Sequence, residues 1–447
     1  MTKLTSLHNF LIIWSGQVAS ILGSEMTNFA TTIWAWQFTG HATPLALIVF
    51  FVQTPRVIAA AFAGPLVDRW NRKQLMMIGD TAAGISTIAI LLLLATNQLE
   101  IWHLYVSGAI KGLFGYLQEL AYSASMSTIV PKQHYARATA MESYISYSGS
   151  AIVAPALAGT LYYIIGLQGI LVIDIFTFAL ALGTISFVHI PQPTASEIKD
   201  INSGNIWQEL TFGFRYIIKR PSLLAILVFL LSSNLVTNAG GAIAAPMILA
   251  KSGNDAAAFA SVQFAIGVGG LVGAAVLSVW GGPSRRIHGL LLGGALGDIS
   301  SVMLGLGRIP SIWMLAGFFE AFFSPFFGSC NQAIWLSKVE PHVQGRVFAC
   351  RYLIAQITSP LGLAIAGPLA DRVFQPAMMS GGSLAGILGG AFGTGAGAGM
   401  ALQYTLFAGC GAFICLGAYT FRLLRDVEDL VPDHEHSDRL RQWNEYQ

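Results

Sequence analysis

The chain has 447 residues, of which 54% are hydrophobic and only 10% are charged, with a formal net charge of +2. Soluble domains carry charge on about 25% of their residues, so this composition excludes an ordinary soluble fold and indicates an integral membrane protein. The small net charge and the absence of a basic run argue against nucleic acid as a partner. The cysteines lie in apolar stretches, which is typical of core packing rather than of disulfides or a metal site; they are Cys330, Cys350, Cys410 and Cys415.

Twelve apolar stretches are long enough to cross a bilayer, which takes about 20 residues. We expect these spans at 8–36, 44–66, 74–96, 101–127, 138–163, 167–189, 222–249, 256–280, 287–308, 311–337, 345–370 and 401–422. The first stretch is too long for the apolar part of a signal peptide, so we predict that it stays in the protein. The pattern predicts an all-α integral membrane protein with both termini on one side.

The basic residues are distributed unevenly between the two sides of such a topology. Eighteen lysines and arginines fall on the side of the termini, and three fall on the opposite side, at Lys251, Arg308 and Arg372. Basic residues accumulate in cytoplasmic loops. The sequence therefore predicts a multi-pass protein of the plasma (inner) membrane with cytoplasmic N- and C-termini.

One long polar stretch, 190–221, divides the chain. Its second half, from Ile206 to Arg220, alternates apolar and polar residues at helical spacing. This spacing predicts an amphipathic helix on the cytoplasmic face, with a solvated linker as the alternative. The expected domains are an N-terminal six-helix bundle (1–189), a cytoplasmic linker (190–221), a C-terminal six-helix bundle (222–422) and a cytoplasmic tail (423–447).

A short polar string separates the second and third spans: Gly64-Pro65-Leu66-Val67-Asp68-Arg69-Trp70-Asn71-Arg72-Lys73. Charges of both signs in a tight turn suit a membrane surface, where cationic side chains anchor. The string resembles the loop signature of the major facilitator superfamily, with Asn71 where that family usually has Gly. The resemblance covers nearly the whole chain and implies two pseudo-symmetric six-helix bundles that transport by alternating access. We expect a monomer.

Within this family the chain is most similar to the macrolide-efflux and enterobactin-exporter branch. That similarity is carried by Trp14-Ser15-Gly16-Gln17, Ile173-Asp174 and Glu209-x-x-x-Gly213 before Pro221. Lys111 stands where helix 4 of the family usually has Arg, and lysine offers only a point charge. The string 154–159 incompletely resembles a helix 5 motif associated with antiporters.

The resemblance also implies a gate. In the family the loop aspartate, here Asp68, contacts the start of helix 11, where the helix dipole favours an anion. Arg72 would pair with an acid of a neighbouring helix, and Asp80 is expected to belong to the same network. The predicted gating residues are Gly64, Asp68, Arg69, Arg72, Lys73 and Asp80.

Several charged residues fall inside the predicted spans, where each costs about 2.5–3.5 kcal/mol if it faces lipid. They must therefore face a polar cavity or one another. The deeper set consists of Glu25, Arg56, Lys111, Glu119 and Glu320, while Glu142 and Arg351 lie near the surface and Asp174 suits a structural hydrogen-bonding role.

In this family helices 1, 4, 7 and 10 line the transport cavity. We hypothesise that Glu25 or Glu320 carries a coupling proton and that Lys111 balances charge or contacts substrate; a static ion pair is the alternative. The polar residues Asn234, Thr237 and Asn238 lie at helical spacing in the seventh span, and many aromatic residues favour a cavity for large amphipathic molecules.

These features predict a secondary active transporter, specifically a proton-coupled exporter (antiporter) of a drug-like or amphipathic small molecule. No cofactor is expected, and the proton gradient is the expected energy source. An uptake symporter or a lipid flippase of the same fold is the alternative. An intramembrane enzyme is disfavoured, because the sequence shows no metal-ligand spacing, nucleophile elbow or phosphate loop.

Two features near the C-terminus stand apart from these motifs. A further Gly-Pro-Leu-x-Asp-Arg string lies at 367–372, on the predicted outward side, so it is not a second copy of the cytoplasmic loop. The segment 380–400 is rich in glycine, and its spacing allows either a flexible loop or a closely packed helix pair.

Overall fold

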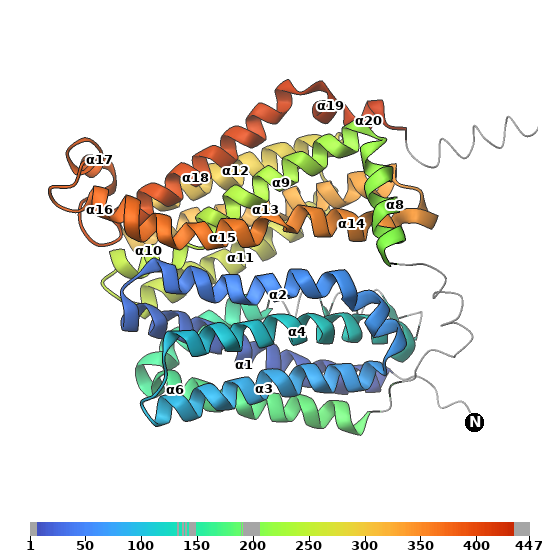
Figure 1. Ribbon diagram of the computed structural model, residues 1–447, viewed down its shortest axis with the longest axis horizontal. Coiled ribbons are helices and arrows are strands. Elements are labelled where there is room, and N and C mark those ends of the chain that lie inside the picture. The colour runs from blue at the N-terminus through green and yellow to red at the C-terminus, as the bar shows by residue number, and fades with distance from the viewer. Residues whose placement is uncertain are drawn as a thin grey trace, which may run out of the picture. The chain divides into compact units, whose positions relative to one another are not determined.

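The computed structural model of the protein describes residues 7–131, 134–135, 138, 141–142, 149–188, 190 and 206–432 (Figure 1). Within these ranges the side chains of residues 7, 64, 65, 68, 69, 127, 149, 206–210 and 342 lie outside the description. The described backbone is almost wholly helical and contains no β-strand, as the composition predicts.

The described N-terminal part consists of long helices. They are α1 (Leu7–Thr39), α2 (Ala42–Arg69), α3 (Arg72–Ala95), α4 (Ile101–Ile129) and α6 (Gly149–Phe187). Short turns join α1 to α2, α2 to α3 and α3 to α4. Within α6, Gly166 has φ 63° and ψ −172°, which breaks the helix into two segments. This backbone conformation is accessible to glycine because it lacks a Cβ atom. The break lies where the sequence predicts a turn between two spans.

The remainder of the chain alternates long helices with short ones. They are α8 (Ile206–Ile218), α9 (Pro221–Gly241), α10 (Ala244–Lys251), α11 (Ala256–Trp280), α12 (Arg286–Leu306), α13 (Pro310–Lys338), α14 (Gln344–Gln356), α15 (Thr358–Leu369), α16 (Gln375–Met378), α17 (Ala385–Phe392), α18 (Ala398–Gly417), α19 (Arg422–Arg425) and α20 (Val427–Leu430). Between α15 and α16 the chain forms a π-helical turn, η4 (Ala370–Phe374).

Nine helical segments of the described chain are long and apolar enough to cross a membrane. One of them is α6, which the break at Gly166 divides in two. Helices α1 and α4 have 33 and 29 residues but are not among the nine. If α1 and α4 each cross the membrane and α6 crosses it twice, the total is the twelve spans that the sequence predicts. The number twelve stays a prediction.

The string at 64–73 is more helical than the sequence suggests. We expected a loop, but α2 continues to Arg69 and α3 begins at Arg72, so the turn contains only Trp70 and Asn71. The Asn71 side chain accepts a hydrogen bond from the backbone N–H of Gln74, 3.2 Å away, and thereby caps α3. Asparagine is one of the residues favoured at the N-cap of a helix. Capping of α3 therefore explains why Asn71 is suited to this position.

The described residues divide into two compact units. Unit 1 contains residues 1–203, 242–267 and 363–400, and unit 2 contains residues 204–241, 268–362 and 401–447. In unit 1, α1 packs along α6, α2 packs along α4, and α3 contacts both α4 and α6 (Figure 1). The apolar core of unit 1 includes Phe10, Ile13, Met76 and Ile185.

In unit 2, α12 packs along α13, and α14 packs against α8 and α9. Helix α8 is the helix expected at 206–220. Its Ile217 side chain is fully buried among residues such as Leu223 and Trp335, whereas Phe214 and Ile218 are exposed. Part of the apolar side of α8 therefore packs against the protein itself. Residues 191–205 of the predicted linker and residues 433–447 of the predicted tail lie outside the described chain.

The glycine-rich segment contains the short helix α17. The loop that follows it is tied to α16, because the Gln375 side-chain amide donates to the backbone oxygen of Gly395 (2.7 Å) and its oxygen accepts from the N–H of Gly399 (3.2 Å). A Cβ atom added at Gly386 or Gly390 would meet nothing within 4 Å. These two glycines therefore do not form a closely packed helix pair in the described structure.

Candidate functional site

A polar cavity of about 720 Å³ lies among the helices of unit 1. Four of the five predicted deep charges line it: Glu25 on α1, Arg56 on α2, and Lys111 and Glu119 on α4. Lys111 and Glu119 are eight residues apart, which places them on one face of α4 about 12 Å from each other. The cavity is also lined by Asp80, Glu142 and Asp174.

Arg56 and Glu119 form an ion pair across this cavity. The Arg56 Nη2 atom is 2.7 Å from Glu119 Oε2, and the guanidinium also lies over the ring of Tyr116 at 5.4 Å. The Arg56 and Glu119 side chains are 36% and 40% exposed. An ion pair with this much access to water contributes little to stability, so both charges remain available to a ligand or to solvent in the cavity.

Lys111 is a second, partly buried cation in the lining of the unit 1 cavity. Its ammonium group interacts electrostatically with the carboxylates of Asp174 and Glu25. The Asp174 carboxylate accepts hydrogen bonds from the hydroxyls of Ser24 (3.2 Å) and Thr87 (3.1 Å). Asp174 thus has the hydrogen-bonding surroundings that a structural role requires, while it also lines the cavity.

Glycines set the close helix spacing around these charges. A Cβ atom added at Gly23 of α1 would lie 3.1 Å from Asp174 Oδ1, and one added at Gly112 of α4 would lie 2.0 Å from the backbone oxygen of Val52. Small residues allow such helix approach in membrane proteins. The glycine next to Lys111 therefore brings α4 against α2.

Asp80 of α3, which we predict to belong to the gating network, lines the unit 1 cavity. Its Oδ2 atom accepts a hydrogen bond from Gln17 Nε2 (3.0 Å), and Gln17 Oε1 accepts one from Gln118 Nε2 (2.7 Å). This chain joins α1, α3 and α4 at one end of the cavity. Sequence spacing gave no sign of Gln17 as a partner, because the two residues are 63 positions apart.

The other predicted gating residues lie at the α2–α3 turn. Arg72 Nη1 donates to the backbone oxygen of Ala124 on α4 (2.9 Å), and Lys73 Nζ donates to the backbone oxygens of Ser186 and Val188 at the end of α6 (2.8 and 2.9 Å). Both cations therefore bind backbone carbonyls at helix ends. The predicted roles of Gly64, Asp68 and Arg69 depend on side chains outside the description.

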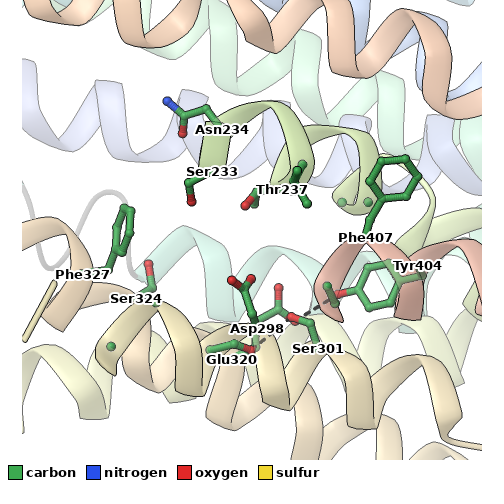
Figure 2. Close-up of a pocket in the computed structure, with 17 residues that line it drawn as sticks. Ser233, Asn234, Thr237, Asp298, Ser301, Glu320, Ser324, Phe327, Tyr404 and Phe407 are labelled. Carbon is green, nitrogen blue, oxygen red and sulfur yellow. Dashed lines mark hydrogen bonds between the residues drawn. The ribbon is translucent and has the colours of Figure 1, made fainter. Parts of the chain in front are cut away.

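A second, smaller cavity of about 210 Å³ lies in unit 2 (Figure 2). Glu320 of α13 lines it together with Asp298 of α12. Tyr404 of α18 donates a hydrogen bond to Glu320 Oε2 over 3.3 Å, and Cys415 Sγ lies 3.8 Å from Asp298 Oδ2. Among the described residues that line this cavity there is no lysine, arginine or histidine.

Two of the three predicted polar residues of α9 line the cavity, and the third forms a hydrogen bond to the backbone of its own helix. Asn234 and Thr237 are among the residues that line the unit 2 cavity, and Figure 2 shows Thr237 on the side of the helix that faces Asp298. The Asn234 side-chain amide donates to the backbone oxygen of Ala355 (2.8 Å). Asn238 is not among the lining residues, and its side-chain amide donates to the backbone oxygen of Asn234 (2.7 Å).

Sequence reasoning missed Asp298 altogether. The residue lies inside the predicted span 287–308, so the cost of placing a charge in the membrane was the signal that could have identified it. A Cβ atom added at Gly411 of α18 would lie 2.5 Å from Asp298 Oδ2, so this glycine leaves room for the carboxylate. In the described chain, no group of three or more His, Cys, Asp or Glu residues is placed to hold a metal ion.

Comparison with known proteins identifies the family. The family model of the Major Facilitator Superfamily matches residues 13–363. The chain belongs to the Major Facilitator Superfamily. It is therefore a multi-pass membrane transporter and not an enzyme.

Among its relatives are two named efflux proteins. The chain is 24% identical to macrolide efflux protein A of Streptococcus pyogenes over 374 residues, which covers 81% of this chain and 90% of the relative. It is 22% identical to the multidrug efflux pump Tap of Mycolicibacterium fortuitum over 369 residues, which covers 81% and 89%.

The fold is similar to that of a bacterial homologue of the human lysosomal transporter Spinster, solved in an inward-facing and unoccupied conformation. The TM-score is 0.64 at 13% identity, and the match covers 95% of this chain and 97% of the other.

Proposed function

We propose that the protein is a proton-coupled exporter of drug-like, amphipathic small molecules, working by alternating access in the plasma (inner) membrane with its termini in the cytoplasm. The observation that carries this proposal is the pairing of a large charged cavity in unit 1 with a small acidic cavity in unit 2. The efflux activity named for two relatives supports the export direction.

The unit 1 cavity has the size and chemistry for such a substrate. Pockets for drug-sized ligands measure about 300–1,000 Å³ and combine apolar walls with a few polar groups. The cavity of about 720 Å³ falls in this range. It presents both signs of charge, from the Arg56–Glu119 pair and from Lys111, beside apolar side chains such as Ile48 and Phe178.

The proton-coupling part of the proposal rests on the carboxylates. Acidic side chains inside a membrane protein are the groups from which proton relays are built. Glu320 has a tyrosine hydroxyl as its hydrogen-bond donor, and Glu25 interacts with Lys111 across the unit 1 cavity. For Glu25, the alternative to a role in proton transfer is a static ion pair with Lys111.

The test is transport by purified protein in liposomes with an imposed pH gradient. A fluorescent macrolide derivative and a lipophilic organic cation are suitable probes, and internal pH is recorded with an entrapped dye. We expect substrate movement to drive proton movement in the opposite direction. Glu320→Gln is expected to abolish this coupling, whereas Asp429→Asn, at an exposed position on α20, is the matched control.

The outcomes separate the alternatives. Movement of probe and proton in the same direction indicates an uptake symporter, and transfer of labelled lipid between leaflets indicates a flippase. Retained coupling in both Glu320→Gln and Glu25→Gln contradicts the proposed proton role of these acids.

A further inference from the structure

Helix α8 lies at the point where the chain enters a membrane span. Only residues 219 and 220 separate its end at Ile218 from the long apolar helical segment that begins at Pro221. Within unit 2, α8 packs against α9 and α14 and runs across their direction (Figure 1). A helix that crosses the end of a membrane-spanning helix lies along the membrane surface. One side of α8 therefore faces the protein, and the other side faces the lipid headgroups.

The inner side of α8 is fixed to unit 2. A Cβ atom added at Gly213 would lie 2.6 Å from the Cβ atom of Cys350 on α14, so this glycine allows the two helices to approach closely. Ile217, four positions later on the same side of the helix, is fully buried. Just after the helix, Arg220 forms an ion pair with Glu340 over 3.3 Å.

The outer side of α8 carries two rows of residues. The apolar row consists of Phe214 and Ile218, which are 49% and 46% exposed. The basic row consists of Arg215 and Lys219, which are both exposed. The backbone N–H of Lys219 donates to the Arg215 oxygen (3.1 Å), so the helical spacing continues to Lys219. Because residues four positions apart are neighbours on a helix, each row is continuous, and the two rows lie side by side.

The positive charge of the basic row is not cancelled by the acids of the described chain. Among the described residues neither Arg215 nor Lys219 forms an ion pair, in contrast to the adjacent Arg220. A further cation comes from α14, where the Arg346 guanidinium lies 5.6 Å from the centre of the Phe212 ring. Phe212 is three positions before Arg215 and therefore borders the basic row. The outer side of α8 thus places exposed apolar side chains next to concentrated positive charge.

We propose that the outer side of α8 is a binding surface for anionic phospholipid. Phe214 and Ile218 lie among the acyl chains, and Arg215 and Lys219 contact the headgroup phosphates. An amphipathic helix places its apolar side at the boundary between headgroups and acyl chains, and basic side chains add attraction to anionic lipids. The sequence predicts an amphipathic helix on the cytoplasmic face, and the two rows add a preference for the charge of the lipid. No transport step enters this proposal.

The experiment measures lipid binding by the whole purified protein in detergent micelles. Phosphatidylglycerol with a fluorophore on one acyl chain is bound to the protein, and unlabelled phosphatidylglycerol, phosphatidylcholine or glycerol phosphate competes for the site. We expect phosphatidylglycerol to compete best and phosphatidylcholine to compete weakly. Glycerol phosphate should not compete, because it lacks the acyl chains that Phe214 and Ile218 contact.

We expect the double variant Arg215→Gln/Lys219→Gln to weaken phosphatidylglycerol binding about 25-fold, because each basic residue at an anionic surface contributes about fivefold, or about 1 kcal/mol. Its binding of phosphatidylcholine should not change. Arg215→Lys retains the charge and should retain the affinity, whereas Phe214→Ser should weaken the binding of both lipids alike. Arg425→Gln is the matched control, because Arg425 is an exposed cation of unit 2 that already pairs with Asp426 (3.0 Å).

Unchanged phosphatidylglycerol binding in the double variant overturns the proposal, and an equal loss in Arg425→Gln overturns it as well. Competition by glycerol phosphate as strong as that by phosphatidylglycerol also overturns it, because the site would then bind free phosphate esters.

A photoactivatable phosphatidylglycerol tests the unaltered protein and does not depend on the folding of any variant. We expect cross-links in the peptide 211–220, and their absence from this peptide counts against α8 as the binding surface. A protein that binds phosphatidylglycerol here but fails to transport contradicts the proposed function alone.

Discussion

The two cavities hold their charges in different ways. In unit 1, three of the acids that line the cavity lie near a base: Glu119 pairs with Arg56, and Lys111 interacts with Glu25 and Asp174. In unit 2, Asp298 and Glu320 lie together in a cavity whose described lining contains no base. Arg56 and Lys111 therefore compensate part of the acidic charge in unit 1, where Asp80 is instead bound by Gln17, whereas the unit 2 acids rely on hydroxyl and thiol donors.

This difference has a consequence for substitution. Removing one partner of a compensated buried pair leaves an uncompensated charge, which is strongly destabilising. Removing a charge that already lacks a basic partner relieves a burial cost. Neutralising substitutions in the two cavities should therefore change stability in opposite directions. Opposite changes in stability would distinguish two kinds of cavity. In the first kind the charges are fixed by their partners, and in the second kind the acids gain a proton or a cation during transport.

The largest effect is expected at Lys111. Replacing it by methionine keeps most of the side-chain volume but leaves Asp174 and Glu25 without their cation. We expect a loss of about 3 kcal/mol in the free energy of unfolding, because the buried Asp174 carboxylate loses its nearby cation; it is measured by equilibrium unfolding of the purified protein in detergent. Lys219→Met, at an exposed cation of α8's C-terminal end, is the control. A double variant with Asp174→Asn should recover part of the loss, and the absence of any recovery would show that the interaction is not the cause.

The opposite sign is expected at Asp298. Asp298→Asn keeps the shape of the side chain and removes the charge, so we expect the free energy of unfolding to rise by about 2 kcal/mol at neutral pH. The matched comparison is Asp174→Asn, which should lower it. If both variants are destabilised to a similar extent, the two cavities do not differ in charge compensation.

Helical spacing and the cost of burying charge predicted much of this arrangement. Four of the five residues of the deep set, Glu25, Arg56, Lys111 and Glu119, line one cavity, and the fifth, Glu320, lines the other. The break near Gly166 and the helix α8 lie where the sequence predicts them. These features depend on local periodicity and on the penalty for a charge in lipid, and both can be read along a single chain.

Partners between helices could not be predicted in the same way. Helical periodicity gives the face on which a residue lies but not which helix that face meets. The bond between Asp80 and Gln17 depends on how α3 packs against α1, and the pairing of Glu119 with Arg56 depends on how α2 packs against α4. The turn itself was predicted too long, because charged residues at helix ends resemble a loop in composition.

A cluster outside both cavities provides a reference for these effects. The Tyr216 hydroxyl on α8 donates a hydrogen bond to Glu340, and Arg220 lies 3.6 Å above the tyrosine ring and 3.3 Å from the same carboxylate. Burial, followed by the bond to Glu340, raises the pKa of Tyr216 above its ordinary value of 10.

We expect Tyr216→Phe to cost about 1.5 kcal/mol, as for a hydrogen bond to a charged group. A raised pKa in the folded state means that the tyrosine's contribution is complete below the unfolded value of 10 and is lost only as the pH rises above it. The cost should therefore be the same at pH 7 and pH 9 in equilibrium unfolding. A cost that already fades by pH 9 would contradict the role of Tyr216 as a protonated donor.

The smallest effect is expected at the Arg56–Glu119 pair, although its atoms are only 2.7 Å apart. Both side chains are more than one third exposed, so water screens their attraction and each must lose conformational freedom to hold the geometry. Glu119→Gln should cost less than about 0.5 kcal/mol, and high salt should reduce even this difference. The same variant should change substrate binding far more than stability if the proposed transport role of this cavity is correct. A stability loss as large as that of Lys111→Met would instead place Glu119 among the fixed structural charges and leave the unit 1 cavity without a charged pair free to meet a ligand.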